Sequence, residues 1–281
     1  MLGLRNSLST SSYVGGFENN YSLEFDAADS LVQCGTLNTY LRNVQKFTIS
    51  MWVYQEDLTT SGQNGLFGKH ESDHHRTYAK IGSDGRMDFG VENGSGNDEG
   101  GRLRLTNADL SSADTWYHIV CVFDGTQSDS TVSVQNKLRA KIYIDGVNKS
   151  VTDSDEFPTH TSNSTDYGNF EVVIGNFQNG TNDIFDGKID EVGIWDVALG
   201  ATAISQIYNS GTPLNLTEPV GTGIADYNTT NAKTNLQVYY RMGDGTENAT
   251  GTTIYDMSAN SNNASMSGFD ESDFVESTPN D

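Results

Sequence analysis

Apolar and polar residues alternate along several short stretches of the chain, a pattern typical of half-buried β-strands. In residues 47–54 (FTISMWVY), Phe47 and the alternate apolar residues share one face, and Trp52 and Tyr54 lie on the other. Residues 116–123 (WYHIVCVF) are apolar on both faces, as in a central strand of a sandwich. Further strands are predicted over residues 21–32, 65–69, 77–81, 87–91, 141–144, 147–151, 170–174, 187–195 and 236–242.

Turn residues separate these stretches, and one helix follows them. The sequences SDG at 83–85 and DG at 145–146 predict tight turns between paired strands. Residues 200–208 carry apolar residues three and four apart, with Gly211 just beyond as a stop signal, so they predict a short helix. About a dozen strands with one short helix predict an all-β, two-sheet antiparallel sandwich.

Acidic residues outnumber basic ones by a wide margin. The 281 residues include 16 Lys and Arg against 38 Asp and Glu, a formal net charge of −22. A nucleic-acid groove needs Lys and Arg to neutralise phosphates, so this composition excludes nucleic acid as a partner. No stretch reaches about 18 consecutive apolar residues, so no membrane insertion is predicted. The first 16 residues lack the apolar core of a secretion signal, which predicts a chain that is not exported by that route.

Two cysteines, Cys34 and Cys121, are too few for a disulfide framework. We expect two buried thiols, although a single bridge between them stays open at this point. The spacing of paired zinc ligands is absent, so a zinc site is not predicted.

Five segments in order carry a family resemblance: SLEFDAADSLV, FTISMWVY, WYHIVCVFDG, AKIYIDG and FDGKIDEVGIWDVALGATAISQIYN. Together they cover residues 17–211 and resemble the laminin-G-like, concanavalin A-like jelly-roll domains. The resemblance implies a two-sheet antiparallel jelly roll. It also implies a module that binds glycans or proteins and that sometimes carries a structural calcium ion.

The expected organisation has four parts: residues 1–16 as an N-terminal arm, 17–212 as the jelly roll, 213–235 as a linker or long loop, and 236–281 as a C-terminal strand with a polar tail. The tail resembles a strand and loop that usually precede the first motif of the family. It either closes the same sandwich, its own or a neighbour's, or begins an incomplete second unit. We favour the first interpretation, because so few apolar residues cannot bury a core alone.

The start MLGLRNSL and the tail YYRMGDG…YDMSANSNN are similar to laminin-G-like proteins encoded by tailed bacteriophages, especially those of marine cyanobacteria. This resemblance implies a non-enzymatic protein of the virion surface, either a capsid decoration or a fibre-associated module. It would be made in the host cytoplasm, displayed in many copies or as a homo-oligomer, and would contact other virion proteins and host surface glycans. The alternatives are a secreted, extracellular bacterial adhesin or lectin module and, third, a glycoside hydrolase.

Catalytic machinery is not evident in the sequence. Related glycosidases place paired carboxylates on alternate residues of one strand, where they flank the scissile bond. The nearest candidates, Asp190 and Glu191, are adjacent, and we expect adjacent strand residues to point to opposite faces. We therefore predict that the protein is not an enzyme. His118 is expected to be a hydrogen-bonded core residue.

Calcium is the one cofactor that the resemblance implies. Calcium binds about six to eight oxygen ligands, which carboxylates and loop carbonyls supply. By motif match the ligands would be Asp26 and Asp190, with Asp183 and Asp186 as further contributors. The alternative is that these acids are exposed or accept hydrogen bonds from turn amides.

A glycan site would need an aromatic platform beside polar groups, because sugar C–H faces stack on rings while hydroxyls need directional partners. The candidates are Trp52, Tyr54, Tyr239 and Tyr240. The alternative for each ring is a place in the core of the sandwich.

Overall fold

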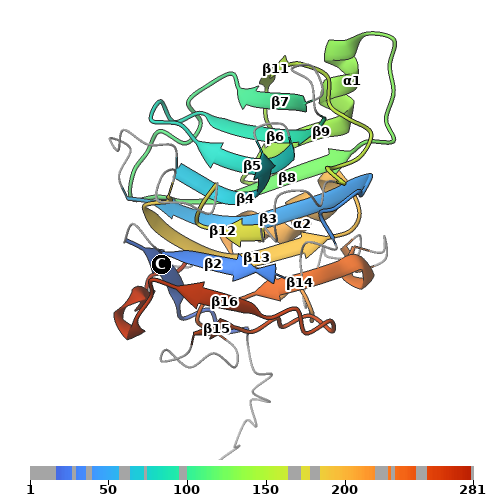
Figure 1. Cartoon of the computed structure of the whole chain (residues 1–281). Coiled ribbons are helices and arrows are strands. Elements are labelled where there is room, and N and C mark those ends of the chain that lie inside the picture. The colour runs from blue at the N-terminus through green and yellow to red at the C-terminus, as the bar shows by residue number, and fades with distance from the viewer. Residues whose placement is uncertain are drawn as a thin grey trace, which may run out of the picture.

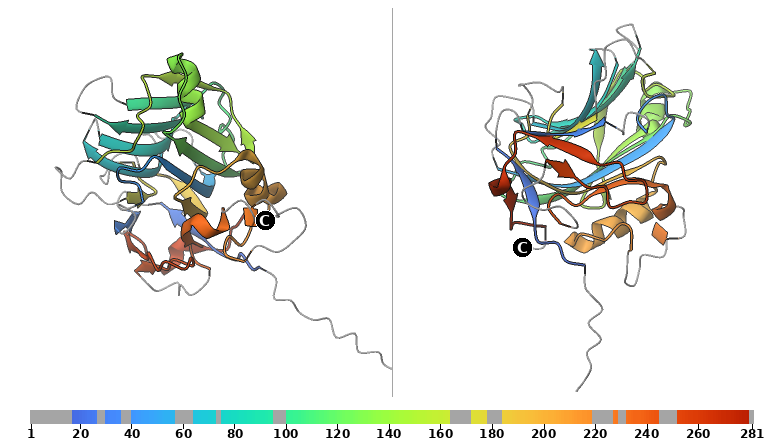
Figure 2. Two further views of the ribbon diagram at one scale, coloured as in Figure 1. Left: turned by 90° about the vertical axis from the view of Figure 1, so that its right-hand side faces the viewer. Right: turned by 60° about the horizontal axis from the view of Figure 1, so that its bottom comes forward.

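The alternating stretches fold into two antiparallel sheets that lie face to face (Figures 1 and 2). The computed structural model describes residues 17–26, 30–35, 40–56, 64–72, 75–94, 100–163, 172–177, 184–218, 227–228, 232–244 and 252–279. The predicted all-β sandwich is therefore confirmed.

Sheet A, the eight-stranded sheet, has the order β10-β9-β8-β3-β13-β1-β17, and β14 also pairs with β13. Its strands are β1 (Ser22–Phe25), β3 (Lys46–Gln55), β8 (Trp116–Asp124), β9 (Ala140–Ile144), β10 (Val147–Asn148), β13 (Gly187–Trp195), β14 (Leu236–Tyr240) and β17 (Phe274–Val275).

Sheet B, the nine-stranded sheet, has the order β11-β7-β6-β5-β4-β12-β2-β16-β15. Its strands are β2 (Leu31–Cys34), β4 (Asn64–Ser72), β5 (His75–Ile81), β6 (Met87–Asn93), β7 (Gly100–Leu105), β11 (Val151–Ser154), β12 (Val172–Ile174), β15 (Thr253–Ile254) and β16 (Ala264–Ser267).

The main core lies between the inner faces of the two sheets. Phe47 and the alternate apolar residues of β3 point into it, as the sequence pattern predicts. The stretch predicted as one strand over residues 21–32 forms two strands instead: β1 pairs with β13 in sheet A, and β2 pairs with β12 in sheet B. Cys34 and Cys121 are both buried and unbridged, one in each sheet.

The outer face of sheet A carries a second apolar cluster beneath the helix α2 (Ala201–Tyr208). Trp195, Leu216 and Tyr227 belong to this cluster. The described part of residues 213–235, the predicted linker or long loop, therefore contributes buried side chains to this cluster.

The C-terminal residues complete both sheets. Strands β14 and β17 join sheet A, and β15 and β16 join sheet B (Figure 1). This segment thus lies within the same sandwich in the monomer.

A further helix, α1 (Val132–Arg139), has the reverse of the usual pattern. Val132 and Val134 are 47% and 46% exposed, while Gln135 and Asn136 are buried. Hydrogen bonds from these two amides to Glu156 and Asp153 hold the helix, so apolar periodicity could not predict it. Neither this helix nor any other in the described residues is long and apolar enough to cross a membrane.

Candidate functional site

Four residues form a row across the outer face of sheet A. In the strand register Glu24 lies opposite Lys188, Lys188 opposite Tyr54, and Tyr54 opposite Trp116. Residues directly opposite in antiparallel strands place their side chains on the same face, about 5 Å apart. We call these four residues the aromatic row. It spans β1, β13, β3 and β8, four neighbouring strands (Figure 1).

The rings of the row are close to one another and only half-buried. The centroids of Tyr54 and Trp116 are 5.4 Å apart, with 55° between the ring planes. The Tyr54 hydroxyl donates a hydrogen bond to Asp114 Oδ1 at 3.4 Å. Two partly exposed rings therefore lie beside a carboxylate.

Lys188 lies between Glu24 and Tyr54 in the row. Its Nζ lies 4.4 Å from the Tyr54 ring centroid and 3.5 Å from Glu24 Oε1, and it donates to Glu56. Burial opposes the ammonium charge, but hydrogen bonding to Glu56 and the charges of Glu56 and Glu24 hold the pKa of Lys188 above its ordinary value. Burial raises the pKa of Glu24, an effect that Lys188 partly offsets.

Buried rings occupy the next row along the same face of sheet A, beneath helix α2. Trp52 is 3% exposed and stacks on Tyr208 of α2 at 5.8 Å, while His118 lies 5.0 Å from Trp52. Ser50 Oγ and His118 Nε2 are hydrogen-bonded at 2.7 Å, as expected of a core histidine. Burial lowers the pKa of His118 to about 3, so the ring is neutral at pH 7.

The four predicted aromatic candidates lie in two different places. Trp52 and Tyr54 point to the outer face of sheet A, with Tyr54 in the row itself. Tyr239 and Tyr240 have no exposed surface. Tyr240 lies in the core between the sheets and Tyr239 in the second cluster, because β14 is covered on both faces. The structure thus leaves neither tyrosine a free ring face for a ligand.

Sequence reasoning did not find Trp116, Lys188 or Glu24 as members of one site. Trp116 begins a strand that is apolar throughout, and the other two are isolated charges in separate strands. Their common row follows only from the register of four strands, which sequence alone does not give.

A bulge in β13 changes the expected geometry of Asp190 and Glu191. Asp190 pairs with Trp52 and Gly193 with Ser50, so β13 holds one extra residue, and Glu191 has a positive φ of 48°. Strict alternation fails here, and both carboxylates are buried close together. Burial, then the charge of Glu191, raises the pKa of Asp190 well above its ordinary value.

The predicted calcium ligands do not form one cluster in the described residues. Asp26 and Asp186 adjoin the paired residues Phe25 and Gly187 at one end of β13. Asp190 lies further along and accepts a hydrogen bond from Asn19 Nδ2 at 2.9 Å. Asp183 is outside the described residues. In the part of the chain that the structure describes, no three His, Cys, Asp or Glu are arranged to hold a metal ion. Calcium binding stays a prediction.

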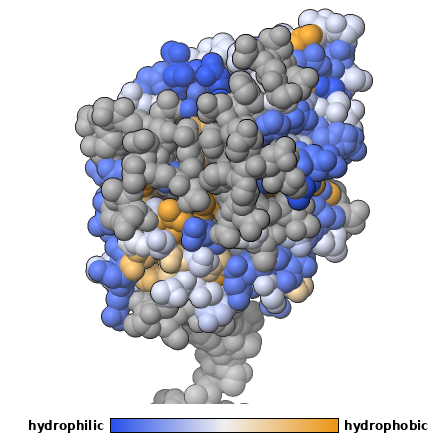
Figure 3. Space-filling model, in the orientation of Figure 1, coloured by the Kyte–Doolittle hydropathy of each residue, from blue (hydrophilic) through white to orange (hydrophobic). Residues whose placement is uncertain are grey.

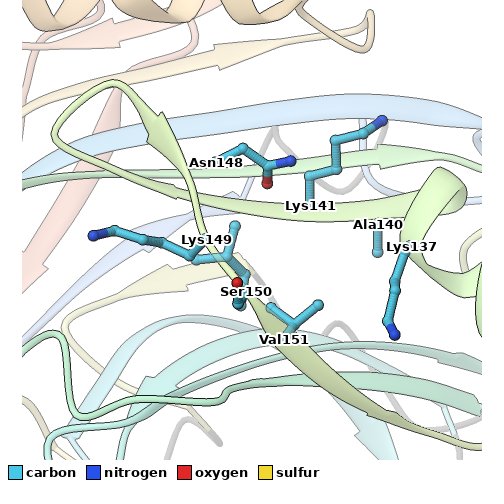
Figure 4. A pocket seen from close by; sticks show the side chains of 8 residues that line it. Lys137, Ala140, Lys141, Asn148, Lys149, Ser150 and Val151 are labelled. Atoms are coloured by element: carbon cyan, nitrogen blue, oxygen red, sulfur yellow. The ribbon is translucent and has the colours of Figure 1, made fainter.

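A pocket of about 250 Å³ lies at the edge of the sandwich between β9 and β11, away from the aromatic row. Lys137, Lys141 and Lys149 line it, and Figure 4 shows their side chains leaving it in three different directions. Their ammonium groups therefore do not converge on one ligand atom.

Comparisons with known proteins agree with the sandwich. The laminin G model of the concanavalin A-like lectin/glucanases superfamily matches residues 26–205. A Bacteroides ovatus protein, described provisionally as a carbohydrate binding protein, matches with a TM-score of 0.56 and 17% identity, over 90% of this chain and 59% of its own. This chain thus spans 59% of the length of that structure. No curated protein sequence matches.

Two further solved structures are less similar. The CBM40 of the IT-sialidase from Ruminococcus gnavus has a TM-score of 0.47 and 12% identity, over 67% of this chain and 96% of its own. A heptameric SAP-like pentraxin from Limulus polyphemus has a TM-score of 0.44 and 13% identity, over 69% of this chain and 84% of its own. At these identities the likeness concerns the fold.

Proposed function

Because the chain belongs to the concanavalin A-like lectin/glucanases superfamily, we propose that it is a non-enzymatic carbohydrate-binding module. The sugar would lie on the outer face of sheet A, against Tyr54 and Trp116. The observation that carries the proposal is the aromatic row itself, in which two half-exposed rings adjoin an ammonium and carboxylates.

The row offers both kinds of contact that a sugar needs. The C–H face of a pyranose packs on an aromatic ring, and its hydroxyls need hydrogen-bond partners when they leave water. Lys188 can donate to a hydroxyl, and Glu24 and Asp114 can accept from one. Tyr54 already contacts Lys188, Trp116 and Asp114 in the free protein, so the platform is ordered before a ligand arrives, which lowers the entropic cost of binding.

Binding without hydrolysis suits the two carboxylates that contact Lys188. Glycoside hydrolysis needs one carboxyl as a proton donor and a second as nucleophile or base, on opposite sides of the bond. Glu24 and Glu56 instead both contact Lys188. This arrangement favours a role for the two carboxylates as fixed hydrogen-bond acceptors for sugar hydroxyls. We expect no release of reducing sugar from any bound oligosaccharide. Such release would contradict the non-enzymatic proposal.

The fold neighbour from Bacteroides ovatus supports the proposal through its description as a carbohydrate binding protein. It shares the sandwich over most of this chain, at 17% identity. The identity is too low to transfer a site, so the location on sheet A rests on the row alone.

The test is a titration of the full chain with a panel of neutral oligosaccharides, followed by the variants Trp116→Ala and Tyr54→Ala. Tyr255→Ala is the control, because Tyr255 is a 41% exposed aromatic residue outside the row. We expect each row variant to bind at least about fivefold more weakly, since ring contacts are worth about 1 kcal/mol or more. Equal losses from Tyr255→Ala, or no loss from Trp116→Ala, would contradict the assigned face.

The finer part of the proposal is the setting in which the module works. The phage-like ends of the sequence support multi-copy display on a tailed phage particle, where weak single-site contacts with host glycans would add up to avidity. Antibodies to the protein should then label purified particles. Absence of labelling, together with binding to polysaccharide, would favour the extracellular adhesin instead.

A further inference from the structure

The outer face of sheet B carries a group of basic residues, in a protein that is acidic as a whole. Arg76 and Lys80 lie on β5, and Arg102 and Arg104 lie on β7. The register places all four on one face: Arg102 shares a row with Tyr78 across β6, and Arg104 shares a row with Lys80. We call these four residues the cationic face. Figure 3 shows hydrophilic residues at the upper left and on the right of the described surface, and a hydrophobic patch below its middle.

The local charge balance differs from that of the whole chain. Among the residues that the structure describes, three acids form ion pairs with these cations, Asp84, Asp88 and Glu92, whereas the chain as a whole carries −22. Within the described residues, the cationic face thus holds one cation more than it has ion-paired acids, in a strongly negative protein.

An aromatic pair holds two of the cations in place. The Tyr78 and Phe177 rings meet edge-on at 4.7 Å, and a Cβ on Gly90 would come within 2.4 Å of the Tyr78 ring. Tyr78 thus lies directly over Gly90. Arg76 Cζ is 5.2 Å and Lys80 Nζ 5.3 Å from the Tyr78 centroid, within the range of cation–π attraction.

Arg102 is the cation with unused donors. Arg76 donates to Glu92 at 2.7 Å and Arg104 to Asp84 at 2.8 Å. Arg102 makes one ion pair, with Asp88 at 3.9 Å, and no hydrogen bond within the described residues, while its side chain is 43% exposed. Its Nε is buried without a partner in this part of the chain. A guanidinium has five N–H donors, so most of its binding capacity is unspent.

We infer that the cationic face is a second binding site, which takes a carboxylate-bearing sugar with its carboxylate on Arg102. A guanidinium fork and a planar carboxylate match in geometry and form paired hydrogen bonds. Thr152 and Ser154 lie opposite Arg104 and Arg102 on β11, so hydroxyl groups continue the face beside the guanidinium groups.

The overall charge argues for one carboxylate rather than a long polyanion. Repulsion from the rest of the chain is screened beyond about 8 Å at physiological salt, so a small anion senses mainly the local cations. A polyanion would extend beyond these local cations, over a protein whose net charge is −22. The sugar part of the inference rests on the proposed function, and the carboxylate part rests on Arg102.

The two sites are independent, because they lie on the outer faces of opposite sheets of the sandwich. A failure of the proposed function and a failure of this inference can therefore be told apart. Loss of the aromatic row should leave binding at Arg102 intact, and the reverse should also hold.

The test compares methyl β-D-glucuronide with methyl β-D-glucoside, which differ only in the carboxylate, by NMR titration of the full chain. We expect saturable binding of the glucuronide, at least about tenfold weaker binding of the glucoside, and loss of affinity between about 50 and about 500 mM NaCl. Arg102→Ala should weaken glucuronide binding at least about tenfold, and Arg102→Lys should restore only part of it, because Lys keeps the charge without the fork. Arg42→Ala, an exposed arginine elsewhere, should change nothing.

Three results would overturn the inference. Equal binding of the two glycosides would remove the role of the carboxylate. Sulfate binding as tight as glucuronide binding would reduce the face to a general anion site. Loss of glucuronide binding in Trp116→Ala but not in Arg102→Ala would place the ligand on sheet A, and would leave the proposed function standing alone.

Discussion

Tyr239 donates a hydrogen bond to Glu191, and this contact ties β14 to the bulge of β13. Arg241 adds an ion pair to the same carboxylate at 3.2 Å. The C-terminal segment therefore supplies the hydrogen-bond and ion-pair partners of the buried Glu191 carboxylate. Without them this charge would lie unpaired in a low-dielectric interior. Sheet A and the C-terminal segment should fold as one unit.

Removal of residues 236–281 should abolish cooperative folding. The deletion strips β14 and β17 from sheet A and β15 and β16 from sheet B, and it leaves Glu191 without its partners. Circular dichroism during heating measures the outcome. An unchanged melting transition would mean that this segment is an appendage to the sandwich.

The stability of the protein should fall as the pH rises through the titration of Glu191. Burial raises its pKa from 4.5 to about 7, with Arg241 partly offsetting the shift. Between these values the folded state holds more protons than the unfolded state, so raising the pH favours unfolding. We expect Glu191→Gln to remove about 1–3 kcal/mol of the loss of stability across this pH range. Urea unfolding across this pH range checks it, and parallel slopes for both proteins would contradict the assignment.

His118 should contribute with the opposite sign. Burial lowers its pKa from 6.5 to about 3, so the unfolded state takes up a proton first as the pH falls, and stability is lost below pH 6.5. The imidazole proton shifts of His118 should stay constant down to about pH 4. A midpoint near 6.5 would show that this ring is open to solvent.

Gly90→Ala should disturb the face of sheet B. The added Cβ would meet Tyr78 within 2.4 Å, so the ring must move, at a cost of about 1–3 kcal/mol. Gly200→Ala is the matched control, because a Cβ there meets nothing within 4 Å. We expect that change to stay within about 0.5–1 kcal/mol, since Gly200 is a helix N-cap. Denaturant midpoints for the two variants give the comparison.

The sequence pattern predicted the parts of the fold that depend on alternation. Phe47 and its alternate neighbours enter the core, and Trp52 and Tyr54 point outward, because ten consecutive residues of β3 keep a regular pleat. The pattern could not show the bulge at Glu191, because an extra residue is defined only by the pairing of β13 with its neighbouring strand β3. The pattern could not separate β1 from β2 either, because the same alternation of apolar and polar residues runs through both.

The candidate site was predictable in part for the same reason. Tyr54 follows from alternation, whereas its pairing with Trp116 and Lys188 follows from register. Tyr239 looks like Tyr54 in the sequence, but a cluster under α2 covers it. Burial of an outer face by a later segment leaves no signal in the strand itself.

The most direct measurement of the central claim is amide NMR of the labelled chain during titration with the tightest-binding neutral oligosaccharide. We predict that the largest shift changes fall on β1, β3, β8 and β13 around Tyr54 and Trp116, and that Trp116→Ala removes them. Changes centred elsewhere, with the row unaffected, would contradict the claim that sheet A holds the glycan.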